Sequence, residues 1–154
     1  MYEKVLLVHS ILRWLAIAAV AYAFLRALRG WLGNSSRGSL DKLSERVAVI
    51  AMDVQLTVGL LLYFVWSPTT HRAFGDMGAA MKDSEMRFWA VEHVTFMLGA
   101  VALVHVGKVL ARKASNDKAQ HRRLVICLGI ALALMVVGTP WPGSKIARPW
   151  IRTA

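Results

Sequence analysis

The sequence has a single cysteine and none of the common catalytic motifs. Because Cys127 stands alone, neither an intrachain disulfide nor a cysteine-based metal site can form, and we interpret it as a small packing residue. The patterns GxSxG, HExxH, CxxC and the P-loop do not occur. Gly59, Gly99 and Gly129 fit close contacts between helices better than phosphate binding. Nothing here marks a stand-alone enzyme.

The composition combines many apolar residues with a strong positive charge. Hydrophobic residues make up 56% of the 154 residues, and the formal net charge is +10. A soluble domain of this size is rarely so apolar. A nucleic-acid binder displays its basic residues on one face, whereas here they lie between long apolar runs. We therefore predict an integral membrane protein that contacts the lipid bilayer and no nucleic acid.

Four apolar runs approach the length that crosses a bilayer, since about 20 helical residues cover a hydrocarbon core of about 30 Å. The runs are residues 5–28, 47–66, 88–110 and 124–138. The first is too long for a signal peptide and is interrupted by His9 and Arg13, so we expect a retained helix. The predicted fold is all-α, an up-down four-helix membrane bundle in which residues 1–154 form one transmembrane domain.

Lysine and arginine are unevenly divided between the two ends of this bundle. The connections after the first and third helices, with their flanks, carry eleven of the nineteen basic residues. Basic connections stay in the cytoplasm. We therefore expect both termini, the loop 67–87 and the basic tail 140–154 on the outer side, where Trp66, Trp89, Trp141 and Trp150 form an interfacial belt.

A weak internal repeat relates the two halves of the chain. A shift of 84 residues places His9 on His93, and the second helix of each half ends alike, in Ser67-Pro68 and Thr139-Pro140. The repeat predicts two pseudo-symmetric helical hairpins related by a twofold axis along the membrane normal. His9 and His93 then lie at similar depth on diagonally opposed helices.

Two imidazoles that approach one axis from opposite sides match six-coordinate haem iron. We therefore predict that His9 and His93 hold a haem b, with hydrogen-bonded packing as the alternative role. Arg13, one turn from His9, is expected to pair with Glu92 across the bundle or to bind a haem propionate or a quinone carbonyl. Met97, one turn from His93, is an alternative axial ligand or a packing residue.

His105 and His121 are weaker candidate ligands. His105 is rotated by roughly 120° from His93 about the helix axis, which argues against a second haem. Asp53 lies at a similar depth and is expected to form a hydrogen bond with His105, as a proton-entry or structural element. His121 lies in a basic connection, where we expect a solvated side chain.

The outer loop contains His71 together with Met77, Met81 and Met86. Thioethers and imidazoles favour copper, so this loop is a possible copper site. A short interfacial helix with Met77 and Met81 facing lipid explains the same residues more simply.

Four segments resemble one family of membrane proteins. They are LLVHSILRW (residues 6–14), DVQLTVGLLLYF (53–64), FWAVEHVTFM (88–97) and TPWP (139–142). They are similar to the small four-helix bacterial membrane proteins commonly labelled cytochrome b, over nearly the whole chain. The resemblance implies a four-helix fold in a bacterial inner membrane and a b-type haem on His9 and His93. The long outer loop and the basic tail depart from the family pattern.

The expected function is membrane electron transfer through this haem, with quinol as the electron partner. The alternative is a cofactor-free structural or assembly subunit of a larger respiratory or photosynthetic complex, in which His9, His93, Arg13 and Glu92 form an internal hydrogen-bond network. A copper or proton carrier is less favoured because no continuous polar file runs through the four helices.

Overall fold

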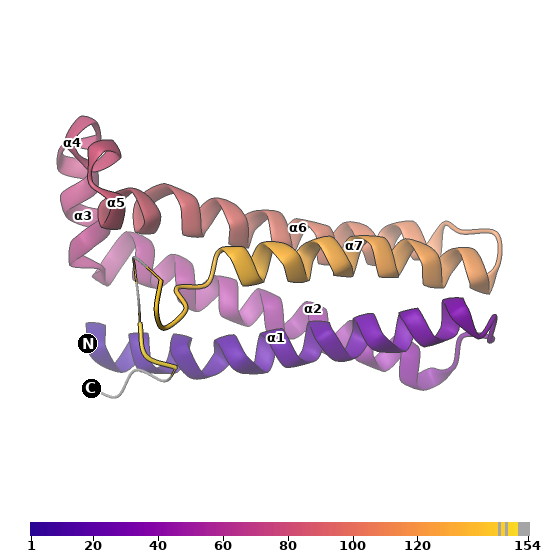
Figure 1. Cartoon of the computed structure of the whole chain (residues 1–154). Helices are drawn as coiled ribbons and strands as arrows, with labels where there is room; N and C mark the ends of the chain where they lie inside the picture. Colours follow the sequence, from indigo (N-terminus) through magenta and orange to yellow (C-terminus); the bar gives the residue numbers. More distant parts are fainter. Residues whose placement is uncertain (145, 147, 151–154) are drawn as a thin grey trace.

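The computed structural model describes residues 1–144, 146 and 148–150, and over these residues the chain is an all-α bundle of four long helices (Figure 1). These are α1 (Tyr2–Leu32), α2 (Ser39–Leu61), α6 (His93–Arg112) and α7 (Asp117–Val137). One π-helical segment, η1 (Leu62–Trp66), extends α2, and another, η2 (Phe88–Glu92), precedes α6. The short helices α3 (Pro68–Gly75), α4 (Met77–Lys82) and α5 (Ser84–Arg87) cap the end of the bundle at which α1 begins.

The long helices form two hairpins that run in the same direction. α1 packs against α2 and α7, and α6 packs against α7 and α2, so α1 and α6 are diagonal neighbours. Both hairpin turns lie at the same end of the bundle, opposite the α3–α5 cap (Figure 1). The predicted four-helix fold with two hairpins is confirmed.

The outer surface of the bundle is apolar. Within the described residues, four helices are long and apolar enough to cross a membrane, and only 17% to 33% of the most apolar stretch of each is buried inside the protein. The exposed remainder needs a hydrocarbon environment, because water would leave this large apolar surface hydrated. The chain is therefore a multi-pass membrane protein by length and composition.

The starts of α2 and α7 lie outside the apolar runs because caps, and not hydrophobicity, set them. α7 begins at Asp117, well before residue 124, because the Asn116 side chain accepts a hydrogen bond of 2.9 Å from the Ala119 N–H. α2 begins at Ser39, before residue 47, where the Asp41 side chain accepts from the Gly38 N–H at 2.8 Å. The first turns of both helices are thus polar and stand at the membrane surface.

Small residues let the helices approach closely. Ala16, Val20, Ala23 and Ala27 form a buried stripe along α1 at helical spacing. At the contact of α6 with α7, a Cβ added to Gly107 would lie 2.7 Å from Cys127 Cβ, and Cys127 is buried as expected. The predicted close contacts are confirmed in the same way, since Cβ atoms added at Gly59, Gly99 and Gly129 would lie 3.0 to 3.2 Å from side chains of other helices.

A buried polar network closes the end of the bundle where the hairpin turns lie. The Arg37 guanidinium pairs with the Glu45 carboxylate and donates to the Gln120 side chain at 2.7 Å. The Arg37 backbone N–H donates to the Asp117 carboxylate at 3.1 Å. The first loop is thereby bonded to both hairpins.

The expectation that His121 is solvated is wrong. His121 is only 1% exposed, because its ring lies against Gly30 on α1, where the missing side chain leaves room for it. A histidine in a basic stretch can thus be a packing residue when a glycine faces it.

The described part of the C-terminal tail packs on the N-terminal half of α1. The Trp150 carbonyl oxygen accepts hydrogen bonds of 2.8 Å from Arg13 Nη2 and from Trp14 Nε1. Arg148 forms an ion pair of 2.5 Å with Glu85 in the cap. Two further basic residues of the predicted tail, Lys145 and Arg152, lie outside the described residues.

Candidate functional site

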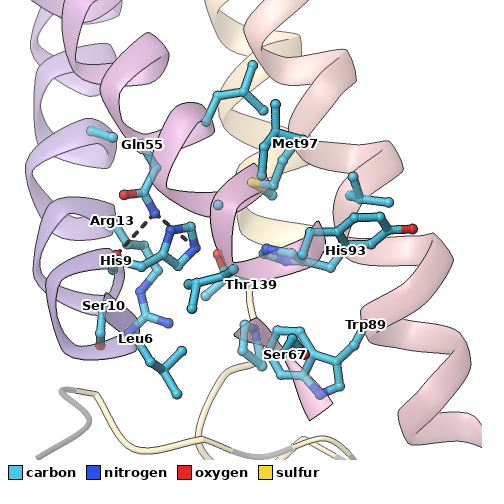
Figure 2. Close-up of a pocket in the computed structure, with 18 of the residues that line it drawn as sticks. Leu6, His9, Ser10, Arg13, Gln55, Ser67, Trp89, His93, Met97 and Thr139 are labelled. Atoms are coloured by element: carbon cyan, nitrogen blue, oxygen red, sulfur yellow. Dashed lines mark hydrogen bonds between the residues drawn. The ribbon is translucent and has the colours of Figure 1, made fainter. Parts of the chain in front are cut away.

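The structure brings His9 and His93 together across the bundle. His9 comes from α1 and His93 from the start of α6, and their ring centroids lie 6.4 Å apart with an angle of 73° between the ring planes. Figure 2 shows the two side chains pointing into one cavity from opposite sides. The sequence repeat thus predicted a spatial pair that lies 84 positions apart in the chain.

The cavity around the two histidines occupies the cap end of the bundle. Its floor takes one residue from each long helix: Ala16, Met52, Val101 and Met135. Most of the wall is apolar, and the polar residues that line it include the two histidines, Ser10, Arg13, Gln55 and Thr139. This arrangement encloses a small number of polar groups in an apolar site, which is the usual composition of a ligand pocket.

The ring of His93 is held in one tautomer by the end of α7. His93 Nδ1 lies 2.7 Å from the carbonyl oxygen of Gly138. A carbonyl oxygen only accepts, so Nδ1 carries the proton and donates it. The Gly138 carbonyl is available because α7 ends at Val137. His93 Nε2 therefore keeps its lone pair, and histidine ligands of metals are commonly oriented by such a bond.

Gln55 on α2 positions His9. Its side-chain Nε2 donates to the His9 backbone oxygen at 3.1 Å and lies 3.3 Å from His9 Nε2. Sequence analysis missed Gln55, although a signal was present: it is a polar side chain in the middle of an apolar run. The hydrogen bond to the His9 ring is long, so a stronger ligand can replace it.

Several buried polar atoms of the cavity have no hydrogen-bond partner. Among the described residues these are His9 Nδ1, Arg13 Nε, Gln55 Oε1 and Trp89 Nε1. Trp89 lies beside His93, with ring centroids 5.4 Å apart, and was assigned only to the interfacial belt. Buried polar atoms are nearly always paired with protein, water or ligand. Their convergence on one cavity leaves several hydrogen bonds there for water or for a polar ligand.

The expected pairing of Arg13 with Glu92 is wrong. Glu92 instead forms an ion pair with Arg87 at 2.7 Å and does not line the cavity. The cause is the π-turn of η2, whose hydrogen bonds join residues five apart and bring Arg87 and Glu92 onto the same side. Arg13 does line the cavity, and its Nη2 donates to the Trp150 carbonyl oxygen.

The weaker candidates lie in different places. Met97 lines the cavity next to His93, whereas His105 and His121 do not. The predicted hydrogen bond of His105 with Asp53 is confirmed at 2.8 Å. His71 Nε2 lies 3.0 Å from the Phe64 carbonyl oxygen and donates to it, at the membrane end of α3.

We tested the donor set against the spacing that a metal requires. Two imidazoles on opposite sides of one metal, with bonds of about 2 Å, place their ring centroids roughly 6 Å apart. The observed 6.4 Å agrees with this spacing. Over the described residues, no three His, Cys, Asp or Glu side chains gather as metal ligands.

The cavity volume constrains how a porphyrin would enter. The volume of about 160 Å³ suits a benzene-sized molecule, whereas drug-sized ligands occupy pockets of about 300–1,000 Å³. A porphyrin therefore requires lining side chains to turn aside. Met97 is suited to this, because methionine is unbranched and has three rotatable side-chain bonds. The donor atoms of His9 and His93 match the ligand type of haem iron, whereas the cavity as it stands is smaller than a porphyrin.

Comparison with known proteins adds no assignment. No protein family, curated protein or solved structure matches the chain. The function is therefore inferred from the geometry of the site.

Proposed function

We propose that the chain is a membrane electron-transfer subunit that holds a haem b between His9 and His93 and exchanges electrons with quinol. The observation that carries the proposal is the pair of imidazoles from diagonal helices, spaced as two ligands of one metal. The unpaired polar atoms around them support it, since they could bond to the polar groups of a ligand.

The protein residues have distinct roles in this proposal. His93 binds through Nε2, because its Nδ1 proton is held by the Gly138 carbonyl. His9 supplies the second nitrogen, and Gln55 holds its backbone in place. The apolar floor formed by Ala16 and Met52, among others, excludes water and lowers the local dielectric constant. Haem, when bound, supplies one-electron redox chemistry whose potential these surroundings tune.

Arg13 and Trp89 are the candidates to bind the acidic groups of the haem. Arg13 Nε and Trp89 Nε1 are unpaired donors in the cavity wall. Arginine binds carboxylates in a fork of parallel hydrogen bonds. Arg13 and Trp89 would therefore hold the carboxylates of the bound group.

The membrane orientation is part of the same proposal. With eleven of nineteen basic residues around the hairpin turns, the positive-inside rule places those turns in the cytoplasm. The cap and both termini then lie outside a bacterial inner membrane, and the two histidines lie near its outer leaflet.

A second candidate function is a cofactor-free structural or assembly subunit of a larger respiratory or photosynthetic complex. The small volume of the cavity favours it, as do the bonds of His93 with Gly138 and of His9 with Gln55. These bonds satisfy part of each ring without any metal and join α1 with α2 and α6 with α7.

An optical experiment separates the two functions. The protein is produced in haem-replete cells, purified and reduced with dithionite, and its absorption spectrum and metal content are recorded. The proposal expects split α and β haem bands in the wild type, and their loss in His9→Ala and in His93→Ala. His71→Ala is the matched control and keeps the bands, because His71 is bonded to backbone outside the cavity.

The opposite result is equally clear. Folded wild-type protein without pigment, in which His9→Ala lowers the unfolding temperature and changes no spectrum, excludes the haem and supports the structural subunit. Bound metal without a porphyrin excludes the cytochrome function as well.

A further inference from the structure

An acid–base pair faces the membrane on the other half of the bundle. Asp53 on α2 and His105 on α6 form a hydrogen bond of 2.8 Å, and both side chains are 47% exposed. Along α2, Asp53 is seven residues from Arg46 at the hairpin-turn end, and along α6, His105 is seven residues from Arg112 at the same end. Seven helical residues correspond to about 10 Å, so the pair lies at one depth within the apolar spans.

The surroundings of the pair are largely apolar, and the polar neighbours one turn away are Thr57 on α2 and Lys108 on α6. Ile50 and Val54 on α2 and Val106 and Val109 on α6 are exposed large hydrophobic residues. An ionisable group that faces hydrocarbon is costly, and such groups in membrane helices nearly always face a protein interior or a water-filled cavity. Half-exposed Asp53 and His105 therefore need a covering partner.

The hydrogen-bonding capacity left on this pair shows what the partner must offer. Asp53 Oδ1 accepts from His105 Nε2, whereas Asp53 Oδ2 and His105 Nδ1 make no further hydrogen bond within the described part of the chain. A charged imidazole donates from both nitrogens, and a carboxylate accepts at both oxygens. When His105 is protonated and the pair is ionic, one donor and one acceptor are thus left side by side at the same depth.

We propose that this face, formed by α2 and α6 around Asp53 and His105, binds a second copy of the chain. A twofold axis along the membrane normal keeps each residue at the same depth in both copies. It also reverses the order of α2 and α6 across the interface, so that α2 of one copy faces α6 of the other. Asp53 then faces the partner's His105, and His105 faces the partner's Asp53. Each imidazolium donates to two carboxylates, and each carboxylate accepts from two imidazoliums.

This charge complementarity favours a second copy over another occupant. The closed ring of two carboxylates and two imidazoliums has no net charge, and it pairs every donor with an acceptor inside the membrane. Ala102, an exposed small residue one turn before His105, allows close approach of the facing helices. The face therefore complements itself without a ligand from outside.

The first test measures association in liposomes. The labelled full chain is reconstituted at low density, and single-molecule photobleaching steps are counted over a range of protein-to-lipid ratios. We expect wild-type dimers and a dissociation constant about tenfold higher for His105→Leu, since two hydrogen bonds between the copies are lost. The double substitution Asp53→His/His105→Asp restores dimers, because it preserves the alternation of the ring.

The second test locates the interface by crosslinking. Since Cys127 is buried, an introduced cysteine reports on its own surface. Ala102→Cys is expected to form disulfide-linked dimers upon oxidation. Ile130→Cys is the matched control on α7, a helix diagonal to α2. Ile130 is 48% exposed and lies seven residues from Arg123, at a depth similar to that of His105. The cysteine at this position is expected to remain uncrosslinked.

Several results would overturn the proposal. A monomeric wild type is one, and it would point to a different subunit on this face. The others are an unchanged dissociation constant in His105→Leu and equal crosslinking at both cysteine positions. Helical circular dichroism of each variant identifies unfolded protein. If His105→Leu does not fold, the dissociation constant of Asp53→His/His105→Asp decides between the outcomes. The histidine pair in the cavity is not involved, so these results are independent of haem binding.

Discussion

Gly59 on α2 lies against the ring of His9 on α1, so that a Cβ added at Gly59 would be 3.0 Å from His9 Cε1. This separation is shorter than an ordinary contact between carbon atoms of about 3.5–4.0 Å. The position of the His9 ring therefore depends on a residue without a side chain in the neighbouring helix.

Replacement of Gly59 with valine should displace His9. We expect Gly59→Val to destabilise the protein by about 1–3 kcal/mol through overpacking, and to reduce the haem retained per chain. Thermal unfolding in detergent and the reduced absorption spectrum measure the two effects. Gly75→Val is the control, since a Cβ at Gly75 would meet no atom within 4 Å. Equal effects of the two substitutions would contradict this role of Gly59.

The contact of Gly30 with His121 gives a second prediction. A Cβ at Gly30 would overlap the buried His121 ring, so Gly30→Ala should cost about 1–3 kcal/mol. The cost should fall when His121 is also replaced by alanine, because the overlap disappears. A double-mutant cycle from thermal unfolding measures this coupling. Purely additive effects would mean that the ring moves aside without cost.

The orientation of the chain can be tested with single cysteines. The native Cys127 is buried and provides a low background. In intact cells, a membrane-impermeant maleimide should label Ser84→Cys in the cap and should reach Ser36→Cys in the first hairpin turn only after permeabilisation. Both serines are exposed. The reverse labelling pattern would place the termini in the cytoplasm.

Much of the fold could be predicted because a membrane limits the possible structures. In hydrocarbon, backbone groups must be bonded within the segment, so long apolar runs become helices. The repeat then placed His9 and His93 at one depth, and the helix rotation correctly separated His105 from them. These predictions depend on length, periodicity and polarity, which can be read along one chain.

The details of the site depended on features that have no sequence pattern of their own. The π-turn before His93 brings Glu92 beside Arg87, and one extra residue in a turn rotates the next part of the helix by about 100°. The partner of His93 is the backbone carbonyl of Gly138, which any residue could supply. The C-terminal tail reaches Arg13 through the carbonyl of Trp150.

The amino-acid sequence by itself determined four apolar helices, their up-down order and the common depth of two histidines, because these follow from local hydrophobicity and helix geometry. The tertiary structure alone decided which polar atoms share the cavity, which carboxylate each arginine meets, and that Asp53 and His105 face outward while His121 is buried. Such choices depend on how helices rotate against one another, and that rotation is set by the packing of all the side chains together.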